Sequence, residues 1–119
     1  MSNPVFWILQ CKINDDQLEN LKELMVEMVN ATQADEPGAL IYEWYISADE
    51  KYCHFYECYA DSAAALVHLG NFNTKFGKQF WTCLSPTSTI VYGDPSKVLR
   101  KAMENAGARF MEPLGGFKR

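Results

Sequence analysis

The sequence has 119 residues, enough for one ordinary domain and too few for two, because domains typically hold about 100 to 150 residues. Hydrophobic residues make up 48% and charged residues 22%, which excludes a disordered or low-complexity chain. The net charge of -4 argues against nucleic acid or an anionic membrane surface as the main partner, since both attract clustered positive charge. We therefore expect one domain over residues 1–119.

The first predicted element is a strand over residues 5–13. Its odd-numbered residues are all apolar, which is typical of a strand with one buried face. The apolar run within it stops at Gln10 and follows no basic segment, so it is too short for a signal sequence or a membrane span. We expect a cytoplasmic protein.

A helix is predicted next, with Asn14 as its capping residue and Gln17 at the return position of a capping box. Apolar residues recur at three- and four-residue steps along it and form one stripe. The helix should end before Pro37-Gly38, since proline restricts the residue before it and glycine permits a turn.

Residues 39–47 and 52–60 predict two strands of an antiparallel hairpin. If the turn centres on Asp49 or Glu50, odd-numbered residues pair with odd-numbered residues across the hairpin. One face should then carry Ile41, Glu43, Tyr45, Cys53, Phe55, Glu57 and Tyr59. The other face should pack under the helices, and it comprises Leu40, Tyr42, Trp44, Ile46, His54, Tyr56 and Cys58.

Further elements follow in the second half of the chain. Asp61 should cap a short helix over 62–69 that ends at Gly70-Asn71, and a second helical stretch should continue to the break at Pro86. Residues 87–92 are rich in β-branched side chains and predict a strand. Asp94-Pro95 should begin a last helix that closes at Gly107, before a short strand within 108–114.

This order predicts an α+β, ferredoxin-like antiparallel sheet with helices on one face. The other face would expose the aromatic residues Tyr45, Phe55 and Tyr59, and large exposed aromatic patches mark association surfaces. We therefore expect a homodimer in which two sheets pack face to face.

Two strand carboxylates and one histidine are the candidates for chemistry. Glu43 and Glu57 would lie among aromatic side chains, where desolvation raises a carboxyl pKa toward neutral pH and makes the group a useful base. Alternatively they pair with Lys12, Lys51 or a cation of the dimer partner. His68 lies near the end of its helix and could transfer protons in a cleft, or it could simply cap the helix or lie on the surface. His54 is expected to be a packing residue.

The four cysteines form no CxxC pair, and no HExxH or phosphate-binding glycine loop occurs. We expect buried thiols, no metal and no nucleotide cofactor.

Two segments, 36–43 and 55–69, resemble the antibiotic biosynthesis monooxygenase (ABM) family. The first reads Glu-Pro-Gly-Ala-Leu-Ile-Tyr-Glu, and the second contains an aromatic-Glu strand followed by an Asp-capped alanine run that ends in His68-Leu69. The resemblance covers about residues 5–93, and residues 94–119 look like an extension that only some members carry. It implies a dimeric α+β barrel.

Oxygenase members of that family oxidise quinols, anthrones and other polycyclic phenols with O2 and without flavin, haem or metal. The resemblance to quinol monooxygenases therefore implies a cofactor-independent monooxygenase, with Glu43, Glu57 and His68 as catalytic residues. Tyr45, Phe55 and Tyr59 would form the walls of the substrate site. Haem-degrading members carry a later axial histidine where Lys78 stands here, so haem is not expected. A small-molecule isomerase and a non-catalytic binding protein for aromatic metabolites remain alternatives.

Overall fold

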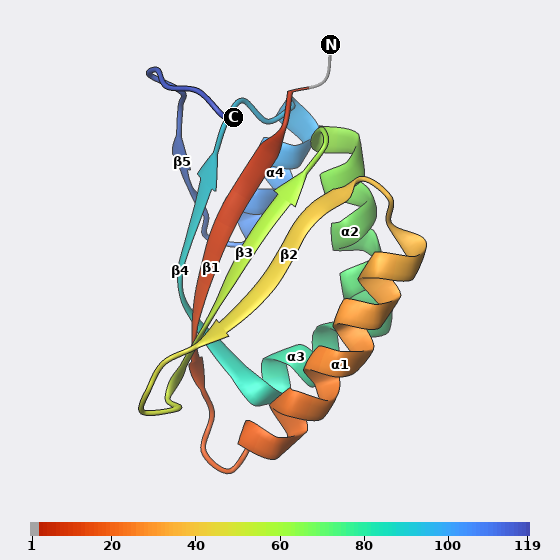
Figure 1. Cartoon of the computed structure of the whole chain (residues 1–119), viewed down its shortest axis with the longest axis vertical. Helices are drawn as coiled ribbons and strands as arrows, with labels where there is room; N and C mark the ends of the chain where they lie inside the picture. The colour runs from red at the N-terminus through yellow and green to blue at the C-terminus, as the bar shows by residue number, and fades with distance from the viewer. Residues whose placement is uncertain (1–2) are drawn as a thin grey trace.

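The computed structural model describes residues 3–119, and in this part of the chain five strands form one sheet beside four helices (Figure 1). In chain order the elements are β1 (Val5–Ile13), α1 (Leu18–Asp35), β2 (Ala39–Ile46), β3 (Tyr52–Tyr59), α2 (Ser62–Lys75), α3 (Gly77–Cys83), β4 (Leu84–Tyr92), α4 (Lys97–Asn105) and β5 (Arg109–Met111).

The strand order across the sheet is β2-β3-β1-β4-β5. The first four strands of this order pair antiparallel, whereas β5 pairs parallel with β4. The prediction of an α+β, ferredoxin-like fold is therefore confirmed. The expectation of a purely antiparallel sheet is wrong at one edge, because α4 carries the chain back along β4 before β5 begins.

The helices cover one face of the sheet, and Figure 1 shows α1, α2 and α3 along the same side of the curved strands. Two buried clusters lie between the layers. One joins β1 and β3 to α1 and α3 around Phe55, Leu21 and Phe80. The other joins β1, β3 and β4 to α2 and α4 around Trp7, Tyr59 and Leu99. Burial of these apolar surfaces is what holds the helices on the sheet.

The register of the β2–β3 hairpin differs from the prediction, which expected the numbers of paired residues to sum to an even value. Tyr42 pairs with Glu57 and Trp44 with Phe55, so paired numbers sum to 99 and odd positions face even ones. The turn is closed by Ser47, whose backbone N–H donates to the carbonyl of Tyr52 and whose Oγ accepts the backbone N–H of Tyr52, and Glu50 takes a positive φ of 59°. The predicted faces hold for β2, whose Tyr42 and Trp44 lie under the helices, whereas those of β3 are wrong, because its odd-numbered residues lie under the helices instead.

Several predicted boundaries also shift. The helix after β1 begins at Leu18 rather than at Asn14, and Asp16 adopts a positive φ of 64° in the intervening turn. Gly70 does not end α2, which continues to Lys75, and Pro86 lies inside β4. The cap of α4 is Ser96, whose Oγ accepts a hydrogen bond from the backbone N–H of Leu99.

Asp61 caps α2 as predicted, accepting the backbone N–H of Ala64 at 2.8 Å. Gly38 lies against this first turn, and a Cβ added there would come 2.5 Å from the Cβ of Ala64. The carbonyl of Gly38 also accepts the backbone N–H of Ala60. Glycine therefore permits a close approach between the segment before β2 and the start of α2.

No helix among the described residues is both long enough and apolar enough to span a membrane.

Candidate active site

A cavity of about 560 Å³ lies between the sheet and the helices α2, α3 and α4. This volume is in the range of small-molecule sites, about 300 to 1,000 Å³. Its walls are mostly apolar or aromatic. They are formed by Trp7, Leu9, Tyr42, Phe55, Glu57, Leu66, His68, Leu69, Gly70, Phe72, Asn73, Phe80, Trp81, Pro86, Thr89, Ala102, Met103 and Ala106.

A network of buried polar side chains surrounds His68 at the wall of this cavity. The Nδ1 atom of His68 lies 2.8 Å from Oε1 of Glu36, and its Nε2 atom lies 3.3 Å from Oε1 of Glu57. The hydroxyl of Tyr59 donates to the same Glu57 oxygen at 2.6 Å. Asn71 donates to the other oxygen of Glu36 at 3.2 Å. One imidazole is therefore held between two carboxylates.

Three elements bring these side chains together. Glu36 directly follows α1 and its backbone N–H closes the last turn of that helix on Thr32. Glu57 lies in β3 on the face covered by helices, opposite Trp7 of β1. His68 lies in α2, two turns after the Asp61 cap. The cap fixes the start of α2, and the apolar side chains on either side of His68 pack its helix onto the sheet.

The three ionisable groups are withdrawn from solvent. Relative exposures are 4% for Glu57, 5% for His68 and 7% for Glu36. Burying an isolated charge is costly, whereas paired and hydrogen-bonded charges are tolerated. Burial raises the pKa of Glu57, and the nearby imidazole of His68 and the hydrogen bond from Tyr59 oppose that rise. The raised pKa makes Glu57 a better proton acceptor, and its contact with an imidazole 3.3 Å away suits general acid–base chemistry.

Two tyrosines keep their protons beside this pair. Burial raises the pKa of Tyr42 and of Tyr59 well above the ordinary value, and the Glu57 carboxylate raises both further. The rings of Tyr42 and Tyr59 lie with their centroids 5.2 Å and 5.1 Å from that of the imidazole. Both phenols therefore stay neutral: Tyr42 forms part of the cavity wall, and Tyr59 is a hydrogen-bond donor to Glu57.

Four of the six predicted site residues come together here. Phe55, Glu57 and His68 line the cavity, and Tyr59 contacts Glu57 from behind.

The other two, Glu43 and Tyr45, do not join the site, because the hairpin register turns them to the opposite face of the sheet. There the Tyr45 hydroxyl donates to Glu43 at 3.0 Å in an exposed position, and the phenol pKa is raised mainly by this hydrogen bond. Glu43 and Tyr45 therefore lie on the uncovered face, as expected, but Phe55, Glu57 and Tyr59 do not share that face with them. His54, predicted to pack under the helices, pairs with Tyr45 and is also exposed.

Glu36, Tyr42 and Asn71 were not predicted from the sequence. Glu36 follows a polar helix end and has the pattern of a surface residue. Tyr42 is expected only to pack under the helices, where it does lie, and Asn71 is expected to end its helix. The one usable signal for Glu36 was the turn glycine two residues later, which brings this segment against α2.

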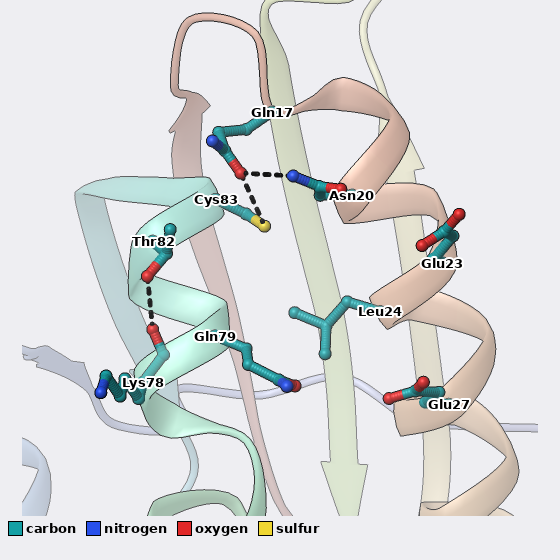
Figure 2. Close-up of a pocket in the computed structure, with 9 residues that line it drawn as sticks. All are labelled: Gln17, Asn20, Glu23, Leu24, Glu27, Lys78, Gln79, Thr82 and Cys83. Carbon is teal, nitrogen blue, oxygen red and sulfur yellow. Dashed lines mark hydrogen bonds between the residues drawn. The ribbon is translucent and has the colours of Figure 1, made fainter.

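A second hollow, of about 490 Å³, lies between α1 and α3 (Figure 2). Its side chains are mainly amides and carboxylates. Oε1 of Gln17 accepts a hydrogen bond from the side-chain amide of Asn20 at 3.1 Å and a second one from the Cys83 thiol at 3.6 Å. These groups satisfy one another near the surface, and no acid–base pair comparable to Glu57 and His68 lines this hollow among the residues described.

Within residues 3–119, no three His, Cys, Asp or Glu side chains are arranged to hold a metal ion together. His68, which lines the larger cavity, is instead paired with Glu36 and Glu57.

The fold and the cavity define an α+β protein with a largely apolar cavity under its helices. No family model and no curated protein matches the sequence. Among solved structures, the chain is similar to MupZ from Pseudomonas fluorescens, with 23% identity, a TM-score of 0.86 and coverage of 100% of this chain and 91% of MupZ.

It is also similar to two proteins provisionally named antibiotic biosynthesis monooxygenases. The one from Caulobacter crescentus CB15 has 16% identity, a TM-score of 0.66 and coverage of 80% of this chain and 91% of its own. The one from Nitrosomonas europaea has 18% identity, a TM-score of 0.67 and coverage of 79% and 92%. The chain therefore has the fold of the ABM proteins.

Proposed function

We propose that this chain is an ABM-family enzyme that transfers protons on a small molecule bound in the larger cavity. The observation that carries the proposal is the buried Glu57–His68–Glu36 chain at the cavity wall. Placing two carboxylates and an imidazole out of water costs folding free energy, and such groups cluster at sites where protons move.

The proposed reaction is O2-dependent monooxygenation of a quinol-like or polycyclic phenol. Glu57, as the carboxylate, accepts a proton from the bound substrate, and His68 takes up or returns that proton. The resulting electron-rich anion reduces O2. At an anthrone-type CH2 group, one oxygen atom enters as a carbonyl, and the other leaves as water with the two hydrogens. The apolar walls exclude water and orient the substrate.

A redox-neutral reaction is the second candidate, and the double pairing of His68 favours it. An acid and a base 3.3 Å apart can remove a proton from one substrate atom and return it to another without any oxidant. An isomerase of this kind would act on an uncharged molecule. No lysine or arginine lines the cavity in the part of the chain that the structure describes, so a phosphate subsite is not favoured.

The proposal includes a homodimer formed through the open face of the sheet. This face carries apolar and aromatic side chains that no helix covers, namely Phe6, Ile8, Tyr56, Ile90 and Tyr92. Phe55 and Tyr59, expected on this face, lie under the helices instead. Apolar surfaces of this kind on a sheet support association of two copies.

Oxygen uptake tests the reaction. Metal-stripped protein is supplied with reduced naphthoquinones and anthrones, and autoxidation is subtracted with a heat-inactivated control. Saturable uptake with an oxygenated product, lost in Glu57→Gln and retained in Glu43→Gln, supports the monooxygenase. Product formation under argon supports the redox-neutral enzyme. Saturable binding with neither reaction indicates a binding protein and contradicts both enzyme proposals.

A further inference from the structure

The larger cavity extends across four neighbouring strands. Its floor takes Tyr42 from β2, Phe55 from β3, Leu9 from β1 and Thr89 from β4. These strands are adjacent in the sheet in this order. Because neighbouring strands lie about 4.8 Å apart, the three intervals from β2 to β4 span about 14 Å. The cavity is therefore long in the direction across the strands.

The chemical character of the walls changes along this length. Tyr42, Glu57 and His68 lie at the end formed by β2, β3 and α2. The other end is formed by β4, α4 and the residue after α4. Ala102, Met103 and Ala106 contribute no hydrogen-bonding side chain there, and Thr89 contributes one hydroxyl. The titratable groups of the cavity are thus confined to one end.

Helix α4 leaves room at the apolar end because it presents small residues there. Its residues Leu99 and Met103 anchor it in the cluster with Val91 of β4. Ala102 and Ala106, on the cavity side, are half-buried and exposed, respectively. The exposed lining residues lie in α2 (Gly70 and Asn73), in α3 (Trp81), in β4 (Pro86) and directly after α4 (Ala106), so the cavity opens between these elements.

We infer that the substrate is an uncharged, elongated and mainly apolar molecule, whose reacting group lies at the Glu57–His68 end while its apolar tail runs along α4. Ala102 and Ala106 then determine which tail lengths fit. Charge supports the assignment, because His68 is already paired with two carboxylates and an anionic substrate would meet uncompensated negative groups. The position of the reacting group rests on the proposed function, whereas the apolar tail site does not.

Binding of 4-alkylphenols from 4-methylphenol to 4-hexylphenol tests this inference. Trp7 and Trp81 line the cavity, so tryptophan fluorescence reports binding without turnover. Affinity in the unchanged protein should rise about three- to fourfold for each added methylene, the increment expected for an apolar chain leaving water. Each compound is used below its solubility limit.

Two variants shorten the tail site. Ala102→Phe and the more exposed Ala106→Trp should leave 4-methylphenol binding within about twofold and remove most of the gain for the longer phenols. The matched control is Glu104→Phe, which adds the same ring to the exposed side of α4. The control should keep the full dependence on chain length.

Affinity that does not depend on chain length would overturn the inference. So would an equal loss for short and long phenols in Ala102→Phe and Ala106→Trp. Length-dependent binding that these variants abolish, without turnover of any phenol or anthrone, would support the tail site and contradict the proposed enzyme, so the two failures are distinguishable.

Discussion

The Nδ1 atom of His68 lies 2.8 Å from Oε1 of Glu36, although 32 residues separate them in the chain. This contact joins the end of α1 to the middle of α2. With Glu57 of β3 on the other ring nitrogen, it places one imidazole at the meeting point of three elements. The geometry of the site therefore depends on how the helices lie on the sheet as much as on any one strand.

Glu57→Gln should lower turnover of a responsive substrate by about 10²-fold or more, because the amide cannot accept the transferred proton. Substrate binding, measured by tryptophan fluorescence, should stay within a few-fold of the unchanged protein. Glu43→Gln, on the exposed face of the same sheet, is the matched control and should leave turnover unaltered. Equal rates in Glu57→Gln and the unchanged protein would remove Glu57 from the mechanism.

Glu36→Gln should lower the free energy of unfolding by about 1–3 kcal/mol, because the buried His68 and Asn71 side chains lose their charged acceptor. Urea denaturation measures this. Glu36→Leu should cost more, since it leaves both donors unpaired. As a control, Glu19→Gln alters an exposed carboxylate in the first turn of α1 and should have little effect. A leucine variant as stable as the unchanged protein would contradict the role of Glu36.

Stability should depend on pH through Glu57. Burial raises its pKa, so the folded chain binds this proton more tightly than the unfolded chain does. The resulting stabilisation is complete below the unfolded pKa of about 4.3 and is lost as the pH rises through the folded pKa. The difference in unfolding free energy between the unchanged protein and Glu57→Gln should therefore shift against the unchanged protein as pH rises. Urea denaturation of both proteins at a series of pH values from about 4 upward measures this difference. A difference that does not change with pH would contradict a raised pKa for Glu57.

The four cysteines should be unreactive in the folded protein. All four are buried, and burial raises the pKa of Cys11 and of Cys53 to about 12 and that of Cys83 above its ordinary value. Because the thiolate is the reactive form, a chromogenic disulfide reagent near pH 8 should label none of them at once and all four after unfolding in urea. Rapid labelling of the folded protein would contradict the burial of the cysteine side chains.

The homodimer predicts a sedimentation mass of twice the chain mass at micromolar concentration. Tyr56→Glu, which places a charge on the open sheet face, should shift the mass toward the monomer. Val26→Glu adds the same charge to an exposed apolar position of α1 and should leave the dimer intact. A monomeric mass for the unchanged protein would contradict association through the sheet.

The elements could be predicted well from the sequence because their signals are local. Alternation in residues 5–13, the apolar stripe before Pro37 and the Asp61 cap all report short-range physics. The fold class followed from their order. Gly70 and Pro86 were misread because packing outweighed the local tendency of each residue to interrupt a helix or a strand.

Only some of the residues around the cavity could be predicted, because their arrangement depends on strand register and on contacts between distant segments. Residue type and position singled out Glu57 and His68, and both line the cavity. Glu43 and Glu57 were expected on one face, but a change of one in the paired sum of the hairpin moves β3, with Glu57, to the face under the helices and leaves Glu43 on the open face. Glu36 could not be predicted, since its partner His68 is distant in sequence and only the packing of α2 beside the segment before β2 brings them together.

Gly38 has no side chain and takes no part in the chemistry, yet it sets the separation on which the chemistry depends. A larger residue would push the start of α2 away from the segment that carries Glu36 two positions earlier. The imidazole would then lose one of its two carboxylates before any catalytic side chain had changed. The distance between Glu36 and His68 therefore depends on residue 38 having no Cβ. A substitution of Gly38, far from the reacting atoms, can in this way change the hydrogen bonding of the imidazole.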